Sequence, residues 1–198
     1  MDSRQFSAFP AAAPGPQPVR KTLLSPAPRA RRLGVLALAA SVILMAACTP
    51  ALNWRQVQVQ ELRAQLPCKP DQATRTVSLA GEAVSLEMAG CQADGALFAV
   101  SRVETNNAAA AGRVMAAWKI QALAALKATD VKPTSIRIPP WASAHATLQA
   151  SGKNPDGKPT QAQLTWLVRE GRVYHLAVYA EQLNDTMTHP FLEDLQIP

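Results

Sequence analysis

An uncharged apolar run, residues 33–47, divides this chain of 198 residues into two parts of different character. Arg29, Arg31 and Arg32 precede the run, which ends in two alanines directly before Cys48. A basic region, a short apolar region and small residues before a cleavage point are the three parts of an export signal. The run has about 15 residues, whereas a membrane-spanning helix needs about 20. The sequence therefore predicts a signal peptide that is removed, and the alternative is an uncleaved single-pass membrane anchor.

The four residues at the end of the run, Met45-Ala46-Ala47-Cys48, resemble the lipobox of bacterial lipoproteins. The resemblance implies that the signal is cut before Cys48 and that the Cys48 thiol is acylated. Met45 stands where that family usually has leucine, with Leu44 beside it. Thr49 follows the cysteine in place of aspartate, which resembles the pattern of lipoproteins sorted to the outer membrane. The implied location is the periplasmic side of the cell envelope, held through an N-terminal lipid, at the outer membrane in preference to the inner one.

Most of the net charge of +6 belongs to the segment before Cys48. Residues 1–47 hold six basic side chains and one acidic side chain, a net of +5, whereas residues 48–198 hold 14 basic and 13 acidic ones, a net of +1. Charges of both signs are interspersed after Cys48, so binding to nucleic acid is not predicted. Residues 1–32 are proline-rich and basic, which predicts a disordered leader. Residues 48–53 are predicted to be a lipidated tether, and residues 54–198 a single domain.

Cys68 and Cys91 remain once Cys48 is assigned to lipid, an even number that predicts a disulfide in an oxidising compartment. The pair flanks a predicted hairpin, in which apolar residues alternate before and after a turn at Gly81-Glu82. Cys68 precedes its first strand and Cys91 is expected to follow its second. A bond there closes a loop of about 24 residues and stabilises the fold by roughly 3 kcal/mol. A metal site or a redox pair is the alternative, but neither a nearby histidine nor a Cys-x-x-Cys spacing supports it.

Period-two alternation predicts further strands on either side of one long helix. A helix is predicted at 106–128, where alanine is abundant and Asn106 or Asn107 can cap the first turn. A short helix is predicted at 186–195. Residues 173–179 are apolar on both faces, which predicts a central strand covered on both sides. The other predicted strands are 54–60 (alternatively a helix at 55–65), 96–104, 134–138, 144–151, 161–169 and 172–180.

These elements predict the α+β class, an antiparallel sheet with one long and one short helix packed on it. Their order, together with the turn Leu66-Pro67-Cys68-Lys69-Pro70, resembles the PsbP and Mog1-like sandwich domains found in small exported bacterial proteins. The resemblance covers about residues 54–198. Members of that family have many roles, so it implies a fold and no single activity.

No constellation of side chains predicts catalysis, a metal site or a cofactor. His145, His175 and His189 share no face at ligand spacing, and His175, on the predicted central strand, is expected to be a core histidine. No serine lies in a Gly-x-Ser-x-Gly setting, and no glycine-rich loop precedes a helix. Trp118 and Trp166 are expected in the core by their spacing, whereas Trp54 could be core or interfacial.

Pro139, Pro140 and Trp141 form the most plausible partner contact, because a stiff Pro-Pro segment can present an exposed tryptophan. The favoured alternative is that Trp141 folds back on the sheet. The sequence thus predicts a lipid-anchored periplasmic protein that is not an enzyme and that binds an unknown envelope protein. The alternatives are a small-molecule receptor or enzyme with its site on the sheet face, and a component of a larger envelope assembly.

Overall fold

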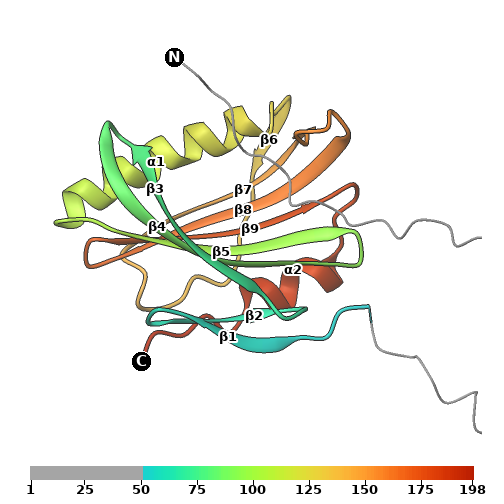
Figure 1. Cartoon of the computed structure of the whole chain (residues 1–198), viewed down its shortest axis with the longest axis horizontal. Coiled ribbons are helices and arrows are strands. Elements are labelled where there is room, and N and C mark those ends of the chain that lie inside the picture. The colour runs from blue at the N-terminus through green and yellow to red at the C-terminus, as the bar shows by residue number, and fades with distance from the viewer. Residues whose placement is uncertain (1–50) are drawn as a thin grey trace, which may run out of the picture. The chain divides into compact units, whose positions relative to one another are not determined.

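The computed structural model describes residues 51–198 (Figure 1). The predictions for the leader, the apolar run and the acylation of Cys48 lie outside the described residues. Among those residues, no helix combines the length and the apolar composition needed to cross a bilayer.

A seven-stranded antiparallel sheet forms the centre of the fold, with the strand order β3-β4-β5-β9-β8-β7-β6. Its strands are β3 (Asp71–Leu79), β4 (Glu82–Ala93), β5 (Ala96–Glu104), β6 (Asp130–Pro133), β7 (Ala144–Lys153), β8 (Pro159–Arg169) and β9 (Arg172–Ala180). A separate two-stranded hairpin joins β1 (Arg55–Val59) to β2 (Leu62–Leu66). The predicted α+β class therefore agrees with the structure at the level of a mainly antiparallel sheet accompanied by two helices.

Two helices of unequal length accompany the sheet, α1 (Ala108–Ala125) and α2 (Asp185–Leu192). The Asn107 side chain accepts a hydrogen bond of 2.9 Å from the Ala110 N–H and so caps α1, as predicted. Asn184 caps α2 in the same way. Figure 1 shows α1 on one side of the sheet, and α2 with the β1–β2 hairpin on the other.

The sheet separates two hydrophobic clusters, and β9 contributes to both because it is the fourth of the seven strands. Tyr174, Leu176 and Val178 join the cluster that contains α2 and the β1–β2 hairpin. Val173 and Ala177 join the cluster that contains α1. The prediction of a central strand with two buried faces is confirmed. Trp118 and Trp166 are buried in the α1 cluster, as expected.

The turn of the β3–β4 hairpin lies one residue earlier than predicted, at Ala80-Gly81 instead of Gly81-Glu82. Leu79 pairs with Glu82, and both turn residues have positive φ, 55° at Ala80 and 83° at Gly81. A two-residue turn of this type needs positive φ at both positions, and glycine is preferred at the second. The prediction placed Gly81 at the first position of the turn, whereas it occupies the second.

Three other predicted elements need correction. The predicted strand at 134–138 is wrong: β6 ends at Pro133, and Ile136 packs in the cluster on the α2 face, so the chain leaves the sheet there. The helix alternative at 55–65 is also wrong, because Gln60 has positive φ and turns the chain from β1 into β2. The strand β2 was not predicted from the sequence. The long helix ends at Ala125, just before Lys127, whose φ is 48°.

Candidate functional site

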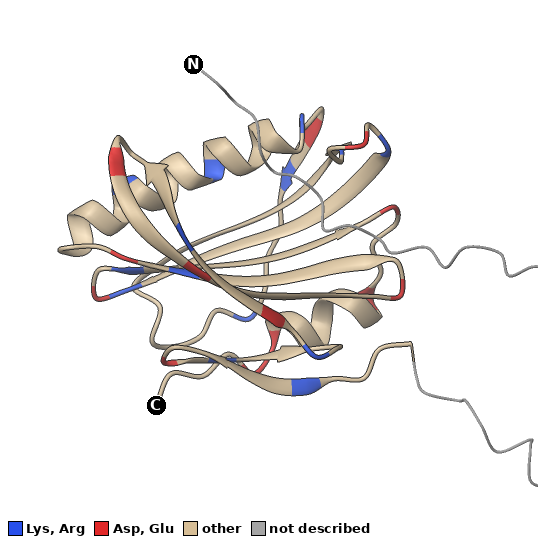
Figure 2. Ribbon diagram, in the orientation of Figure 1, with Lys and Arg blue, Asp and Glu red and all other residues tan. Residues whose placement is uncertain are grey.

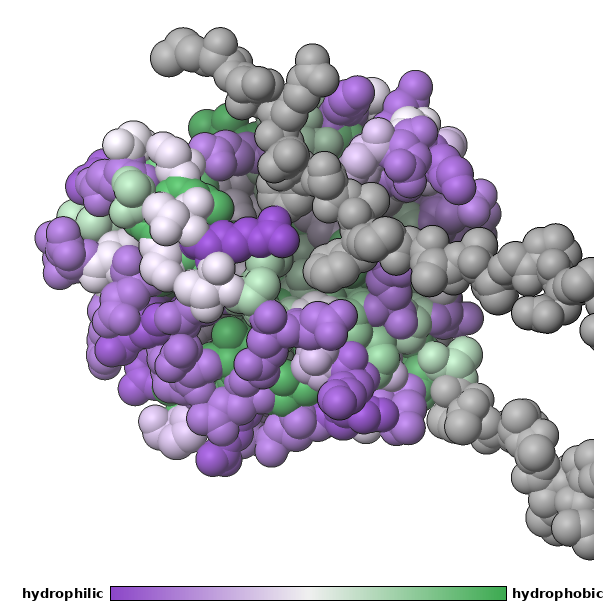
Figure 3. Space-filling model, in the orientation of Figure 1, coloured by the Kyte–Doolittle hydropathy of each residue, from purple (hydrophilic) through white to green (hydrophobic). Residues whose placement is uncertain are grey.

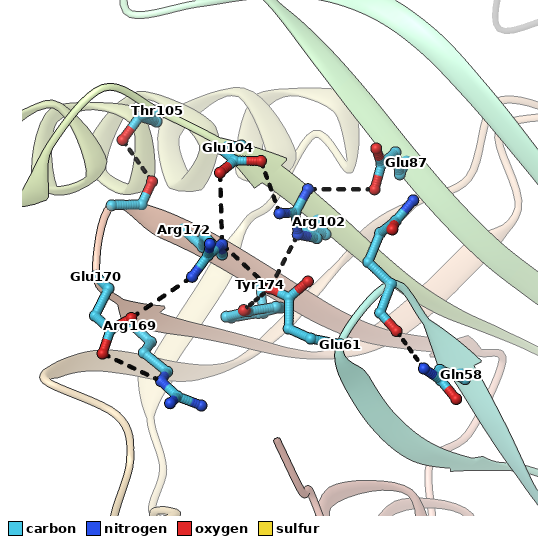
Figure 4. A network of polar contacts seen from close by, with 12 residues as sticks. Gln58, Glu61, Glu87, Arg102, Glu104, Thr105, Arg169, Glu170, Arg172 and Tyr174 are labelled. Atoms are coloured by element: carbon cyan, nitrogen blue, oxygen red, sulfur yellow. Dashed lines mark hydrogen bonds and ion pairs between the residues drawn. The ribbon is translucent and has the colours of Figure 1, made fainter. Parts of the chain in front are cut away.

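A cluster of charged side chains surrounds Arg102 on β5, on the face of the sheet that carries the β1–β2 hairpin (Figure 4). Arg102 is only 7% exposed. Its guanidinium donates hydrogen bonds to three carboxylates: Glu61 at 3.1 Å, Glu87 at 3.3 Å and Glu104 at 2.8 Å. Each nitrogen of the guanidinium therefore has its own acceptor, which is the condition for keeping an arginine away from water. We call Glu61, Glu87, Arg102, Glu104, Arg172 and Tyr174 the Arg102 network.

Glu61 stands at the tip of the β1–β2 hairpin and binds residues of the main sheet. The Tyr174 hydroxyl on β9 donates a hydrogen bond to Glu61 Oε1. Arg172 Nε lies 3.4 Å from the same oxygen. Burial alone would raise the pKa of Glu61, but the hydrogen bonds from Tyr174 and Arg102 outweigh it and lower that pKa. The tip of the hairpin is thus held to the sheet by an ionised carboxylate.

The Arg102 network is suited to fastening the hairpin and not to proton transfer. Burial and the hydrogen bond to Glu61 raise the pKa of Tyr174, so its hydroxyl stays protonated. Burial would lower the pKa of Arg102, but its bonds to Glu104 and Glu61 raise it above the usual value. A general acid or base works best with a pKa near the operating pH, and these pKa values are moved away from neutrality. The arrangement therefore favours a structural role.

Sequence reasoning missed the Arg102 network, although one signal was present. Phe98, Val100 and Arg102 alternate on one face of β5, and the first two belong to the apolar cluster on that face. An arginine that continues an inward-facing series needs partners inside the fold. The series therefore predicts buried carboxylates, but it does not say which ones.

The structure joins Cys68 and Cys91 in a disulfide, with their Cα atoms 6.0 Å apart. Cys91 does not follow the second strand of the hairpin, as predicted, but lies inside β4, where it is buried and packs in the α2-face cluster. β4 runs on to Ala93, which makes it longer than the alternation indicated. The bond ties the segment after β2 to the sheet, so the hairpin is fastened at its base as well as at its tip.

The structure places the predicted contact segment partly inside the fold. Pro139 is buried, Pro140 is exposed and Trp141 is half-buried. The Trp141 indole donates a hydrogen bond of 3.1 Å to the Leu195 carbonyl and meets the Tyr174 ring edge to face at 5.6 Å. Trp141 thus folds back on the sheet, the alternative favoured from sequence, and a partner contact at these residues stays a prediction. Trp54 is also half-buried, against Phe98.

The histidines lie on three different elements. His145 on β7 and His189 on α2 are exposed, and His189 lies 3.7 Å from Glu193. His175 is a core histidine, as expected: its ring stacks on Trp166 at 4.5 Å and meets Trp118 at 5.0 Å. Residues 51–198 contain no group of three or more side chains able to hold a metal ion.

We expect the buried imidazole of His175 to make the fold sensitive to acid. Burial lowers the pKa of His175 to about 3, whereas in the unfolded chain it is about 6.5. Below pH 6.5 the unfolded chain binds a proton that the folded chain does not. Stability is therefore full above about pH 6.5 and falls as the pH drops towards 3. Between pH 6.5 and 4.5 the free energy of unfolding should fall by about 2 kcal/mol.

Denaturant unfolding at stepwise pH measures this slope. The window stops at pH 4.5 because carboxylates with lowered pKa values, such as Glu61, add their own acid dependence below it. His175→Phe keeps an aromatic ring on Trp166 and should flatten the profile, whereas His189→Gln, at an exposed site, should keep the wild-type slope. Equal slopes for wild type and His175→Phe would contradict the assignment.

A shallow groove of about 550 Å³ lies where the described chain begins. Ala51, Leu52, Trp54 and Pro190 give it a mainly apolar lining. None of the groups with a shifted pKa lines this groove, so the structure does not bring an apolar site together with a tuned acid or base. Charged residues of both signs are spread along the ribbon (Figure 2), and the surface in the same view is largely hydrophilic with scattered apolar areas (Figure 3).

Comparison of the chain with protein-family models and with curated proteins found no match.

Proposed function

We propose that this chain is an exported lipoprotein, acylated at Cys48, whose folded part binds a protein partner on the periplasmic side of the cell envelope. The observation that carries the proposal is the use of its three cysteines. Cys68 and Cys91 are joined in a disulfide, which suits an oxidising compartment. Cys48, at the end of the apolar run, is then the single thiol left for acylation. More than one acyl chain gives stable anchoring to a membrane.

The start of the fold supports a close attachment to that membrane. The Asn53 N–H donates a hydrogen bond of 2.8 Å to the Pro67 carbonyl, and Trp54 packs against Phe98. Asn53 follows Cys48 by five residues. A fully extended chain of that length reaches at most about 18 Å. An acylated Cys48 would keep the domain next to the bilayer, and Thr49 favours the outer membrane.

Labelling with palmitate in cells tests the lipid assignment. We expect the wild-type chain to incorporate label and Cys48→Ala to lose it. The Cys68→Ser/Cys91→Ser variant is the matched control, because it removes the other two thiols and should still incorporate label. Incorporation that survives Cys48→Ala, or no incorporation at all, would overturn the proposal. A mature chain that retains residues 1–47 would favour the single-pass anchor.

A binding role is favoured over a catalytic one because Glu61, Arg102 and Tyr174 are engaged with one another in the Arg102 network, and burial alone shifts the pKa values of His175 and Tyr179. The alternative, a small-molecule receptor or enzyme with a site on the sheet face, requires a deep pocket with convergent polar groups. Crosslinking in intact envelopes, followed by gentle detergent extraction, distinguishes binding to a single partner protein from membership of a larger assembly. The mass of the crosslinked product decides between them. The PsbP and Mog1-like resemblance stays a prediction of family, and it transfers no role.

A further inference from the structure

β3 (Asp71–Leu79) is an edge strand of the main sheet, and its free edge runs for nine residues. It pairs with β4 without interruption from Asp71 and Gly90 to Leu79 and Glu82, with no bulge and no proline. The opposite edge, β6 (Asp130–Pro133), is short and ends in a proline. Short strands, prolines and bulges are the usual means of protecting an edge from further pairing. β6 has two of these features and β3 has none of them, although β3 carries the exposed charges of Asp71 and Arg75.

The pairing register shows which backbone groups of β3 point away from the sheet. Leu79 and Glu82 flank a two-residue turn and are therefore a hydrogen-bonded pair, and bonding to β4 alternates along the strand from there. The outward residues are then Gln72, Thr74, Thr76 and Ser78. The Ser78 carbonyl accepts a hydrogen bond of 3.1 Å from the Gln121 side chain, which agrees with this direction. Within residues 51–198, the outward backbone groups of the other three make no hydrogen bond.

The side chains beside this edge differ between the two faces. Arg75 is exposed on the α1 face, and it has no ion-pair partner in the described part of the chain. On the other face, Gln72 and Thr74 line a polar groove of about 220 Å³ together with Gln58 and Gln60 of the β1–β2 hairpin and with Glu87, whose carboxylate is paired with Arg102. A strand added to β3 would therefore meet a positive charge on one face, and on the other a groove of three glutamines and the carboxylate that is paired with Arg102.

A second copy of the chain does not suit this edge. In the two-fold antiparallel pairing that overlaps all of β3, Arg75 would lie directly opposite Arg75 of the second copy. Like charges directly opposite each other on neighbouring strands are destabilising. The charge favours a partner strand that carries an acidic residue at this position.

We propose that β3 receives an extended segment of a partner protein as an additional antiparallel strand, through the backbone of Gln72, Thr74 and Thr76. An acidic side chain of that segment lies opposite Arg75. The residues directly before and after it in the segment point to the glutamine-lined groove on the other face. Backbone hydrogen bonds provide affinity in this mode of recognition, and alternate side chains provide specificity. The inference rests on the proposed binding role and names its partner, but it does not depend on acylation of Cys48.

A synthetic peptide tests the proposal with purified Cys48→Ala chain, so that failure of the lipid assignment leaves the result unaffected. The probe is a capped peptide that alternates threonine with valine and carries a central glutamate, and its control has lysine in place of glutamate. We expect the glutamate peptide to bind on the order of tenfold more tightly in fluorescence anisotropy. Arg75→Glu should reverse this order.

Thr74→Pro separates edge pairing from general surface binding. Proline lacks the outward N–H and is tolerated on an edge strand at such a position, so the fold should persist while the affinity falls on the order of tenfold. Thr74→Val is the matched control and should keep wild-type affinity. Hydrogen exchange of Gln72, Thr74 and Thr76 should slow when the peptide binds.

Three outcomes would overturn the proposal. The first is that wild type binds neither peptide at millimolar concentration. The second is that Thr74→Pro binds as tightly as wild type. The third is that wild type forms a dimer in sedimentation and Thr74→Pro does not, because the edge would then serve a second copy. If Thr74→Pro fails to fold, the charge reversal at Arg75 decides the question alone.

Discussion

Arg102→Met is expected to lower the free energy of unfolding by about 3 to 5 kcal/mol. The substitution removes the positive charge that three carboxylates share, and it leaves Glu61 bonded to Tyr174 in a partly buried setting. The side chains of Glu104 and Glu87 are 59% and 24% exposed to solvent, so water can solvate their charges once Arg102 is removed. The effect should therefore lie towards the lower end of the range. The expected change is seen in urea unfolding with the disulfide intact.

Arg113→Met is the matched control for Arg102→Met. Arg113 on α1 also lies near a glutamate, Glu82 at 3.7 Å, but its side chain is 61% exposed. An exposed ion pair contributes about 0 to 1 kcal/mol, so this variant should unfold close to wild type. In a double-mutant cycle, Glu61→Gln should lower the free energy of unfolding much less in the Arg102→Met background than in wild type. The pair between Glu61 and Arg102 is already broken in that background. An equal effect of Arg102→Met and Arg113→Met would show that the Arg102 network does not hold the hairpin.

Removing the disulfide with Cys68→Ser/Cys91→Ala is expected to lower the free energy of unfolding by about 3 kcal/mol. The two cysteines are 23 residues apart in the sequence, and the bond restricts that loop in the unfolded chain. Alanine is chosen at position 91 because Cys91 is buried in an apolar cluster, where a serine hydroxyl would need a partner. The midpoint of urea unfolding should move to lower denaturant.

Cys48→Ala is the matched control for the disulfide variant. It removes a cysteine and leaves the pair intact, so its unfolding should be that of wild type. Treating the Cys48→Ala chain with a strong reductant should reproduce the loss seen in the double variant. Unfolding of the double variant at the wild-type midpoint would mean that the disulfide contributes nothing to stability.

The strands were predictable from sequence where alternation and turn residues agreed. β5 (Ala96–Glu104) and β9 (Arg172–Ala180) have the bounds that the pattern predicted. Glu170 and Gly171, the two residues left between the predicted strands 161–169 and 172–180, form the turn from β8 to β9 with positive φ at both positions. Alternation depends on side chains two residues apart, and a tight turn depends on adjacent ones. Both signals are therefore local and can be read without knowing the rest of the fold.

Prediction failed where local pattern and tertiary contacts disagreed. Residues 134–138 have the composition of a strand, but the chain there crosses to the other face of the domain, and Ile136 joins the α2-face cluster. The predicted helix alternative at 55–65 ignored the turn between β1 and β2. Nothing in the local pattern indicates that Leu62, Ala64 and Leu66 are buried against a separate sheet.

The candidate site was mostly beyond the reach of sequence reasoning. The pairing of Cys68 with Cys91 could be predicted, because only these two cysteines follow Cys48 in the sequence and each then has one possible partner. Glu61 contacts Arg102 across 41 residues of sequence and Tyr174 across 113. No periodic pattern relates residues so far apart, and the chain offers other carboxylates that could have filled the same role.

By itself, the sequence determined the long helix, the strands with clear alternation such as β5 and β9, the two buried faces of β9 and the pairing of Cys68 with Cys91, because these follow from spacing along the chain. Only the tertiary structure decided that the tip of the β1–β2 hairpin lies on Arg102, that Trp141 reaches the Leu195 carbonyl, and that β3 lies at the edge of the sheet. Those outcomes depend on which strands become neighbours, and strand order is set by the packing of the whole domain.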